Sequence, residues 1–310
     1  MSAGASMLAP AGPLAAGIAP IIWVLIGGAS VIFIGVMLLL ALSLRDRDGK
    51  SAIPTPVWVI GGGVIFPVVV LSGLLWFSIV RSAPYAQPAP RDALVIAVTG
   101  HMWWWEVRYR DPAGGPDIVL ANEMRLPVGR TVVVGLNSAD VIHSFWVPAL
   151  AGKVDTVPGR VNQLVFSASE EGVYHAPCAE YCGLAHARMA LHVVAQSPAD
   201  FDRWLARQAE PAAEPDSELQ ARGQQAFATH GCASCHRIRG FSEAGGSGPD
   251  LTHVASRLFL GAGALRNHPG ALLAWTTNVQ SLKPGARMPS FDHLDKPTLR
   301  ALDAYLGHLQ

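Results

Sequence analysis

The first feature of this 310-residue sequence is its shortage of charge. Only 15% of its residues are Asp, Glu, Lys or Arg, against roughly a quarter in an ordinary soluble chain. Lys plus Arg (23) equals Asp plus Glu (23), so the chain lacks the basic excess that binds nucleic acid. Four cysteines are too few for a disulfide-stapled miniature, and a hydrophobic content of 50% excludes disorder as the dominant state. A membrane-attached protein with folded polar domains remains.

Two long uncharged runs lie near the N-terminus, at Ile21–Leu44 and Val57–Val80. Each matches the roughly 20 apolar residues that cross a hydrocarbon core as a helix. The alternatives are a buried core helix and, for the first run, a cleaved secretion signal. The length of the runs and the second span directly after the first disfavour both. We expect a transmembrane helical hairpin over residues 21–81, preceded by an N-terminal segment, residues 1–20, that is open to processing.

The connection between the two runs predicts their orientation. Arg45, Arg47 and Lys50 lie between the spans, while the N-terminal flank has no Lys or Arg. Positive charge in a short loop favours the cytoplasmic side. We therefore expect a multi-pass protein of the bacterial inner membrane, with both termini on the outer, periplasmic side.

Residues 82–209 have the pattern of a β-sandwich or small barrel. Five short runs with β-branched residues or period-two alternation are separated by Gly and Pro turns, and they are Ala93–Thr99, Trp103–Tyr109, Thr131–Leu136, Val161–Ala168 and Ala190–Ala195. Ser197 followed by Pro198 predicts the start of a short closing helix. Its apolar face would consist of Phe201, Trp204 and Leu205.

A linker rich in Glu and Pro, residues 210–217, separates this part from an all-α domain over residues 218–310. Helices are predicted at Ser217–Thr229, Pro269–Val279 and Pro297–Leu309. The last helix carries four leucines on one face, namely Leu299, Leu302, Leu306 and Leu309.

The segment from Cys178 to Met189 gathers the donors of a metal site. It holds two thiols, Cys178 and Cys182, the imidazole of His186 and the thioether of Met189. This soft donor set favours copper, whereas zinc takes four tetrahedral ligands and usually avoids methionine. A disulfide between the two cysteines is the alternative in an oxidising compartment. It would leave His186, Met189 and the upstream His143 unexplained, so copper is favoured.

A second cofactor motif is Cys232-Ala233-Ser234-Cys235-His236, which is the attachment pattern of c-type haem. A Cys-x-x-Cys pair alone could be a redox disulfide or half of a zinc site. The adjacent His236 and a downstream Met288 favour haem with His/Met axial ligands, which raise its potential. Three other histidines of this part are expected to be surface or capping residues: His253, His268 and His293.

The pattern Cys-x-Glu-x-Cys-x3-His-x2-Met at residues 178–189, with His-Ser-Phe-Trp at 143–146, resembles the subunit II family of haem–copper oxidases. The resemblance implies a cupredoxin-like β-sandwich with a dinuclear copper centre, CuA. Together with the haem motif, the chain resembles a subunit II fused to a C-terminal class I cytochrome c domain, as in the caa3 type of cytochrome c oxidase. The implied fold class is a membrane-anchored multidomain protein with a two-helix hairpin, a β-sandwich and an all-α cytochrome domain.

The resemblance also implies the role of individual residues. The six implied copper ligands are His143 and His186 with one copper each, Cys178 and Cys182 as bridges, Met189, and the backbone carbonyl of Glu180. The Glu180 side chain would bind Mg at the interface with subunit I. Cys232 and Cys235 would form thioethers to haem c, with His236 and Met288 on the iron. Trp103 stands where electrons enter the family's copper domain, whereas Trp104 and Trp105 are expected to pack as core residues.

The implied function is that of subunit II of a proton-pumping cytochrome c oxidase. Electrons from cytochrome c, or from the complex upstream, would pass through haem c and CuA to haem a of subunit I, which reduces O2 to water. Subunits I and III and the membrane are the implied partners. The two spans contain no ionisable residue for a proton path, so pumping belongs to subunit I.

Three alternatives remain open. A quinol oxidase subunit II lacks the copper ligands, and a CuA-containing nitric oxide reductase has similar modules. A non-enzymatic electron carrier or copper-handling protein of the membrane would need one anchor at most.

Overall fold

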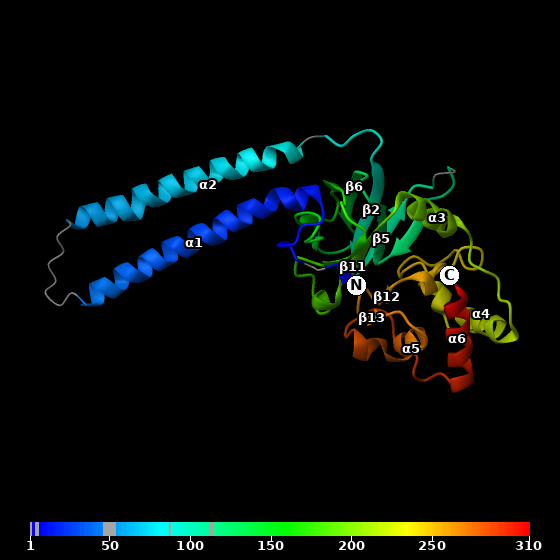
Figure 1. Ribbon diagram of the computed structural model, residues 1–310. Helices are drawn as coiled ribbons and strands as arrows, with labels where there is room; N and C mark the ends of the chain where they lie inside the picture. Colours follow the sequence, from blue (N-terminus) through cyan, green and yellow to red (C-terminus); the bar gives the residue numbers. More distant parts are fainter. Residues whose placement is uncertain (1, 4–5, 46–53, 87, 112–113) are drawn as a thin grey trace. The chain divides into compact units, whose positions relative to one another are not determined.

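A computed structural model describes residues 2–3, 6–45, 54–86, 88–111 and 114–310 (Figure 1). The chain forms two compact units, and each is described by itself. One unit comprises Leu14–Pro88, and the other comprises Met1–Pro13 together with Ala89–Gln310.

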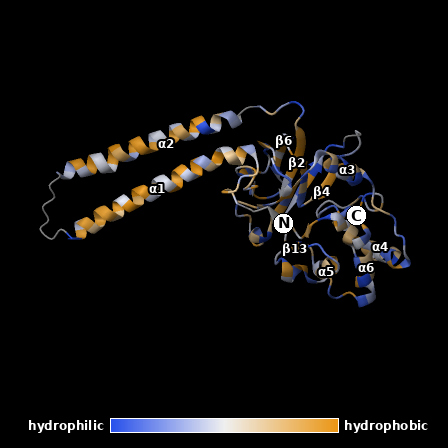
Figure 2. Cartoon of the chain, in the orientation of Figure 1, coloured by the Kyte–Doolittle hydropathy of each residue, from blue (hydrophilic) through white to orange (hydrophobic). Residues whose placement is uncertain are grey.

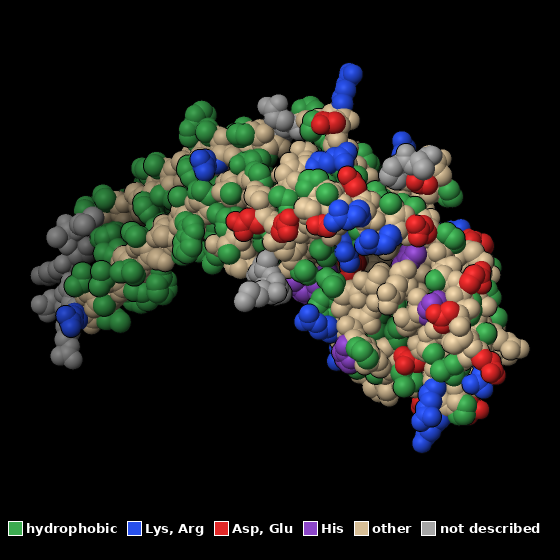
Figure 3. Space-filling model, turned by 45° about the vertical axis from the view of Figure 1, so that its right-hand side comes forward, with side chains coloured by type: hydrophobic (Ala, Val, Ile, Leu, Met, Phe, Trp, Pro, Cys, Tyr) green, Lys and Arg blue, Asp and Glu red, His purple; other side chains and the backbone are tan. Residues whose placement is uncertain are grey.

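The smaller unit consists of two long apolar helices. Helix α1 spans Pro13–Arg45, and the second helix runs through a π-helical segment, η1 (Val57–Ile65), into α2 (Phe66–Ser82) and a short 3-10 turn, η2 (Ala83–Ala86). Their mean hydropathies reach 2.6 and 2.3 (Figure 2), and many of their apolar side chains are exposed (Figure 3). Both predicted spans are thus long enough and apolar enough to cross a membrane.

The first helix begins earlier than the hydrophobic run predicts. Its first residue is Pro13 rather than Ile21, because a proline fits the first turn of a helix, where its missing N–H is not needed. The charged connection that predicts the orientation, with Arg47 and Lys50, lies outside the described residues.

The larger unit begins with a β-sandwich, as the alternating runs predict. Its five-stranded sheet has, in spatial order, the strands β4 (Ile118–Ala121), β3 (Trp104–Tyr109), β2 (Leu94–His101), β6 (Val132–Ser138) and β9 (Asn162–Phe166). The four-stranded sheet has the order β1 (Ser2–Ala3), β10 (Gly172–Pro177), β11 (Ala190–Gln196) and β5 (Glu123–Pro127). A two-stranded ribbon pairs β7 (His143–Phe145) with β8 (Val154–Thr156). Alternate side chains of β6 are fully buried, as one core-facing side of a sheet requires.

A capped helix closes the sandwich. Helix α3 spans Pro198–Ala209, and the Ser197 hydroxyl accepts a hydrogen bond from the Asp200 amide at 3.2 Å. This is the predicted N-cap, which satisfies an amide that has no partner within the helix. Phe201, Trp204 and Leu205 are buried as predicted.

The C-terminal part is helical. It contains α4 (Glu218–Thr229), α5 (Ala271–Leu282) and α6 (Lys296–His308), the 3-10 turns η4 (Cys232–Ser234) and η5 (Val254–Ser256), and a ribbon of β12 (Phe259–Leu260) and β13 (Leu265–Arg266). The four leucines predicted on the last helix face are all buried. Helices α4 and α6 cross closely at Gly223, where a Cβ atom would lie 2.0 Å from the Ala301 carbonyl oxygen.

The sandwich and the helical part share several contacts. The Ala190 amide bonds to the Ala262 carbonyl at 2.9 Å, and the Leu258 amide bonds to the Glu123 carboxylate at 2.8 Å. The His192 ring on β11 stacks on Phe259 of β12 with centroids 3.9 Å apart. Hydrogen bonds and ring stacking therefore join the two parts of this unit.

The close crossing of α4 and α6 gives the first prediction. Gly223→Ala should destabilise the protein by about 3 kcal/mol, because the new methyl group meets backbone that cannot move aside as a side chain would. Thermal unfolding followed by circular dichroism measures the change. The matched control is Gly307→Ala on α6, whose Cβ would meet no atom within 4 Å. It should be neutral or stabilising by up to about 1 kcal/mol. Equal stability of both variants would contradict the packing.

The stacked His192 predicts that the protein loses stability as the pH falls below about 6.5. Burial, with the neighbouring His175 adding to it, lowers the pKa of His192 to about 4, against about 6.5 in an unfolded chain. The unfolded state therefore binds the proton more tightly, and the contribution of neutral His192 is full above pH 6.5 and is lost as the pH falls toward 4. The loss should be on the order of 2 kcal/mol. The free energy of unfolding, measured by denaturation at several pH values between 7 and 4, should fall less steeply for His192→Phe than for the wild type. This variant keeps the ring stacking and cannot take up the proton. The exposed-site control His268→Phe should keep the wild-type slope, and an unchanged slope in His192→Phe would refute the assignment.

Candidate metal centre and haem site

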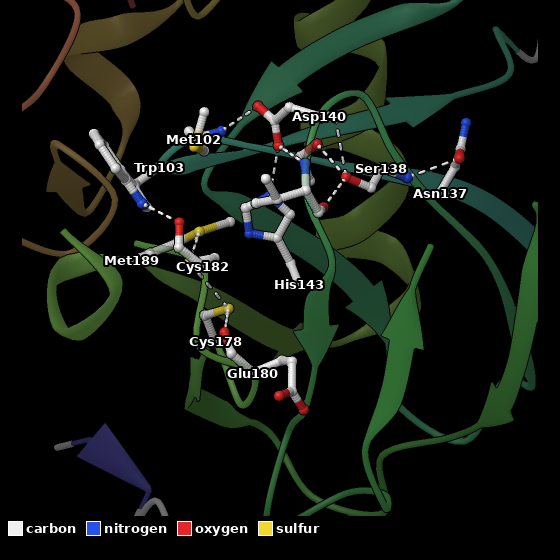
Figure 4. A network of polar contacts seen from close by, with 12 residues as sticks. Met102, Trp103, Asn137, Ser138, Asp140, His143, Cys178, Glu180, Cys182 and Met189 are labelled. Carbon is white, nitrogen blue, oxygen red and sulfur yellow. Dashed lines mark hydrogen bonds and ion pairs between the residues drawn. The ribbon is translucent and has the colours of Figure 1, made fainter. Parts of the chain in front are cut away.

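The predicted metal ligands lie in one loop and on one neighbouring strand. The loop connects β10 to β11, and His143 is the first residue of β7. Two backbone hydrogen bonds close the loop, from the Cys178 amide to the Met189 carbonyl at 2.9 Å and from the Ala179 amide to the Ser144 carbonyl at 3.1 Å. The 3-10 turn η3 (His186–Arg188) then places His186 and Met189 on the same side. Backbone contacts thus bring together donors from distant parts of the sequence (Figure 4).

The donor atoms of this loop are separated by short distances. The Cys182 sulfur lies 3.9 Å from the Cys178 sulfur, 3.5 Å from His186 Nδ1 and 3.8 Å from the Met189 sulfur. The Cys178 sulfur lies 3.3 Å from the Glu180 carbonyl oxygen. A disulfide bond would require about 2.05 Å between the sulfurs. Two thiols with imidazole, thioether and carbonyl donors around them fit a pair of soft metal ions such as copper.

His143 supplies a nitrogen to the same cluster. Its donor atoms and those of Cys178 and Cys182 lie within 4.8 Å of one another, and its side chain is fully buried. Nε2 contacts the Asp140 carboxylate at 2.8 Å, while Nδ1 is buried and has no hydrogen-bond partner among the residues that the structure describes. A carboxylate on one ring nitrogen orients a metal-binding histidine and leaves the other nitrogen for the metal. Gly100 gives the ring its space, since a Cβ there would lie 2.7 Å from His143 Cδ2.

The electrostatics of the cluster favour an ionised thiol and an ionised Asp140. The hydrogen bond with Cys182 lowers the pKa of Cys178, and the same contact raises the pKa of Cys182. Burial opposes the charge on Asp140, yet hydrogen bonds from His143 and from the Met102 amide hold the pKa of Asp140 below its ordinary value. The cluster therefore offers one thiolate readily, and the second thiol ionises when a cation compensates its charge.

Trp103 lies next to this cluster. Its indole Nε1–H donates to the Cys182 carbonyl at 2.8 Å (Figure 4). Gly183 allows the close approach, because its φ of +111° suits glycine and a Cβ there would lie 3.2 Å from the indole ring. Trp104 and Trp105 are buried, in agreement with the predicted core packing.

The second site is a cavity of about 420 Å3 within the helical part and against the sandwich. This volume lies in the range of roughly 300–1,000 Å3 typical of ligand sites. The predicted haem residues all line it, namely Cys232, Cys235, His236 and Met288. The sandwich contributes Met102, Trp103, Trp104 and Asn122 to its wall. The cavity is thus enclosed by both parts of the unit.

His236 is held for iron ligation through one ring nitrogen. Nδ1 contacts the Pro249 carbonyl at 2.8 Å, and burial lowers the pKa of the ring, so the imidazole is neutral. Gly248 allows the ring to lie there, since a Cβ would be 2.8 Å from His236 Cε1. With Nδ1–H donating to a carbonyl, Nε2 keeps a lone pair for a metal. The residues present fit a haem.

The loop that carries Met288 is fixed to helix α5. The Gln280 side-chain amide donates to the Met288 carbonyl at 2.7 Å and to the Ala286 carbonyl at 2.8 Å. Trp275 of α5 lines the same cavity. The predicted sixth ligand is therefore held at the cavity by side-chain to backbone contacts.

Glu180 has two different faces. Its carbonyl oxygen contacts the Cys178 sulfur, whereas its carboxylate points away from the cluster (Figure 4) and lies 3.3 Å from the Lys153 ammonium. Lys153 also lies 3.3 Å from Asp155, and these two hydrogen bonds raise the pKa of Lys153. On the outer side of the ligand loop, the Lys153 ammonium therefore pairs with the carboxylates of Asp155 and Glu180.

The structure adds two residues that the sequence patterns did not single out. Asp140 lies three residues before His143, and this spacing is the only local signal for it. Lys283 is buried beside Trp103, and nothing near it in the sequence indicates that. From the sequence, His253 is expected to be a surface or capping residue: at 4% exposure it does not lie at the surface, but it is the N-cap residue of η5. Its ring contacts the Gln310 and Glu210 carbonyls at 2.8 and 3.0 Å, which ties the C-terminus to the linker.

Comparisons with known proteins agree with both sites. Residues 117–196 match the family described as the periplasmic domain of cytochrome c oxidase subunit II, and residues 220–310 match the family described as cytochrome c. The first family implies the copper of a CuA centre and the second implies haem c.

Similar proteins extend over most of the chain. Cytochrome c oxidase subunit 2 of Alkalihalophilus pseudofirmus is 32% identical over 91% of this chain and 83% of its own length. That of Bacillus subtilis is 28% identical over 86% of this chain and 80% of its own length. A crystal structure of the periplasmic domain of subunit II (CoxB) of Bradyrhizobium japonicum is 32% identical, covers 39% of this chain and 97% of that one, and has a TM-score of 0.36.

Two membrane-length apolar helices, a β-sandwich with a cluster of candidate metal ligands and a helical part with a haem attachment motif occur in one chain. Taken with the similarity over nine-tenths of its length, they show that this chain belongs to the cytochrome c oxidase subunit 2 family, as a membrane-anchored component of an oxidoreductase with a C-terminal cytochrome c domain.

Proposed function

We propose that this chain is the electron-accepting subunit of a proton-pumping cytochrome c oxidase. Electrons from cytochrome c, or from the complex upstream, reach the C-terminal domain and leave from the sandwich toward haem a of subunit I, where O2 is reduced to water. When bound, haem c and the copper pair supply one-electron redox chemistry. The residues of this chain hold these groups, exclude water from them and set the path between them.

The observation that carries the proposal is the position of Trp103. Trp103 lines the haem cavity, and its indole N–H donates to the carbonyl of Cys182 in the ligand loop. One residue therefore touches both sites. This contact supports Trp103 as the residue through which electrons pass from the cytochrome domain to the copper centre.

The same proposal assigns the ligands. Cys178 and Cys182 would hold both coppers, and His143, His186, Met189 and the Glu180 carbonyl would supply the remaining ligands. The distances around Cys182 and the unpartnered Nδ1 of His143 support this set. For haem c, Cys232 and Cys235 form the thioethers, and His236 and Met288 bind the iron. Their place around one cavity supports it.

Further assignments concern the neighbouring subunits. We propose that the Glu180 carboxylate contributes to a Mg site shared with subunit I, which its outward direction supports, since Mg prefers carboxylate and water ligands. Subunit III and a cytochrome c donor are proposed as further partners. The loop between the two membrane helices is placed in the cytoplasm, with both termini on the periplasmic side.

The domain boundaries are proposed as follows. Residues 1–20 form an N-terminal segment, 21–81 the membrane hairpin, 82–209 the copper domain, 210–217 the linker and 218–310 the cytochrome domain. The position of helix α3 before the linker and of α4 after it supports the last two limits.

The function and the bridging thiols are tested together in the purified complex. With reduced cytochrome c, the wild-type complex should consume O2, and Cys182→Ser should lose most of this activity. Electron paramagnetic resonance should show the signal of an electron shared by two coppers in the wild type and at most a mononuclear signal in Cys182→Ser, because one bridge is missing. The matched control is Tyr181→Phe, an exposed neighbour in the same loop, which should keep the signal. A two-copper signal in Cys182→Ser, or a wild type that reduces nitric oxide but not O2, would overturn the proposal.

The haem assignment gives a separate prediction. Met288→Ala should leave the haem covalently attached, because both thioether cysteines are intact. The variant should lose the sulfur-to-iron absorption band at the red end of the spectrum and have a lower midpoint potential, since a thioether ligand raises it. Met102→Leu is the control, because Met102 lines the same cavity from the sandwich side. Loss of the band in the control, or its survival in Met288→Ala, would show that another residue binds the iron.

A further inference from the structure

Lys283 is a buried cation between the two parts of the larger unit. It follows the last residue of helix α5, and only 4% of it is exposed. Its ammonium donates to the Trp103 carbonyl at 2.5 Å and to the Gly261 carbonyl at 2.9 Å. The first acceptor belongs to the sandwich and the second to the cytochrome domain. Lys283 therefore links both domains through one atom.

Burying the charged ammonium of Lys283 costs free energy, so its presence here calls for an explanation. Burial, opposed by Cys182 and assisted by the neighbouring Arg188, lowers the pKa of Lys283 to about 7. Arg257 and Arg287 line the same cavity, so its surroundings already carry positive charge. Both acceptors are neutral carbonyls. Since aliphatic side chains of similar volume usually replace buried ions without loss of stability, packing alone does not account for this residue.

The contact acts on the residue that joins the two cofactor sites. Lys283 holds the backbone carbonyl of Trp103, and the Cys182 carbonyl holds its indole N–H at 2.8 Å. The indole also lies against Gly183. Trp103 is thus fixed at both its backbone and its ring. An error of about 1 Å in such a position is enough to change a rate substantially.

We propose that Lys283 is a positioning residue for electron transfer, which holds Trp103 between the haem cavity and the ligand loop by tying its carbonyl to the cytochrome domain. The inference rests on the proposed function of Trp103. It assigns to Lys283 a role in the path rather than in the attachment of the domains, which other contacts provide. The Arg239 guanidinium, for example, donates to the Ala209 carbonyl at 3.1 Å and also to the Gln208 carbonyl.

The test uses flash-initiated electron transfer from haem c to the copper centre in the purified, fully loaded complex. Lys283→Met removes the donors and keeps a similar volume, and it should slow this step by about tenfold or more. The copper resonance signal and the sulfur-to-iron band should stay unchanged, which shows that both sites are intact. Lys283→Arg, which retains a cation with several N–H donors, should restore at least part of the rate.

The matched control is Arg239→Met, which removes a cation from carbonyl contacts elsewhere between the domains. It should change the rate less than threefold or so, because it does not touch Trp103. If Lys283→Met does not assemble, Lys283→Leu gives the same comparison, because it also removes the donors and keeps an apolar side chain.

The outcomes separate this inference from the function on which it rests. A wild-type complex without electron transfer between haem c and the copper centre would refute the proposed function. A wild type that transfers electrons, with Lys283→Met equally fast, would refute the role of Lys283 alone. Equal slowing in Lys283→Met and Arg239→Met would also refute it, because it would show that Lys283 only attaches the domains.

Discussion

The metal centre depends on the backbone hydrogen bonds that close the ligand loop onto the sandwich. The Cys178 amide bonds to the Met189 carbonyl and the Ala179 amide to the Ser144 carbonyl, so the first and last ligands of the loop and the strand with His143 are joined before any metal binds. Thiolates placed this close repel each other, and their separation must be imposed by the fold. Because the four-stranded sheet already orders both ends of the loop, metal binding requires little further ordering of the chain.

In the haem site, too, the fold positions the candidate ligands through hydrogen bonds and close packing. His236 is oriented by the Pro249 carbonyl and by the space at Gly248, and Met288 is held through Gln280. Neither domain completes this site alone, since Trp103 and Trp104 of the sandwich form part of its wall. The fold therefore places both cofactor sites at one contact between domains. The two sites are neighbours because the two domains contact each other there, and neither domain alone would bring them together.

Local patterns predicted much of this structure. Five strand runs, the cap at Ser197 and the leucine face of the last helix are found where the sequence indicates them, because period, capping and burial are local properties. The other strands escaped prediction, namely β1, β4, β5, β7, β8 and β10 of the sandwich and the ribbon of β12 and β13, since they are short or lack clear alternation and depend on their neighbours. The contact of Lys283 with Trp103 joins residues 180 positions apart and has no local signal. The same holds for His253, whose burial comes from the chain's end folding back on the linker.

Because both domains form the wall of the haem cavity, they are not independent modules. The potential of a haem depends on its exposure to solvent and on the polarity around it. Here Trp103 and Trp104 of one domain line the cavity that contains the haem attachment motif of the other. A cytochrome domain severed at the linker would place that side of its haem in water. The surroundings of this cavity therefore depend on the fusion as a whole, and we expect substitutions of its lining on the sandwich side to change the potential of a haem bound there.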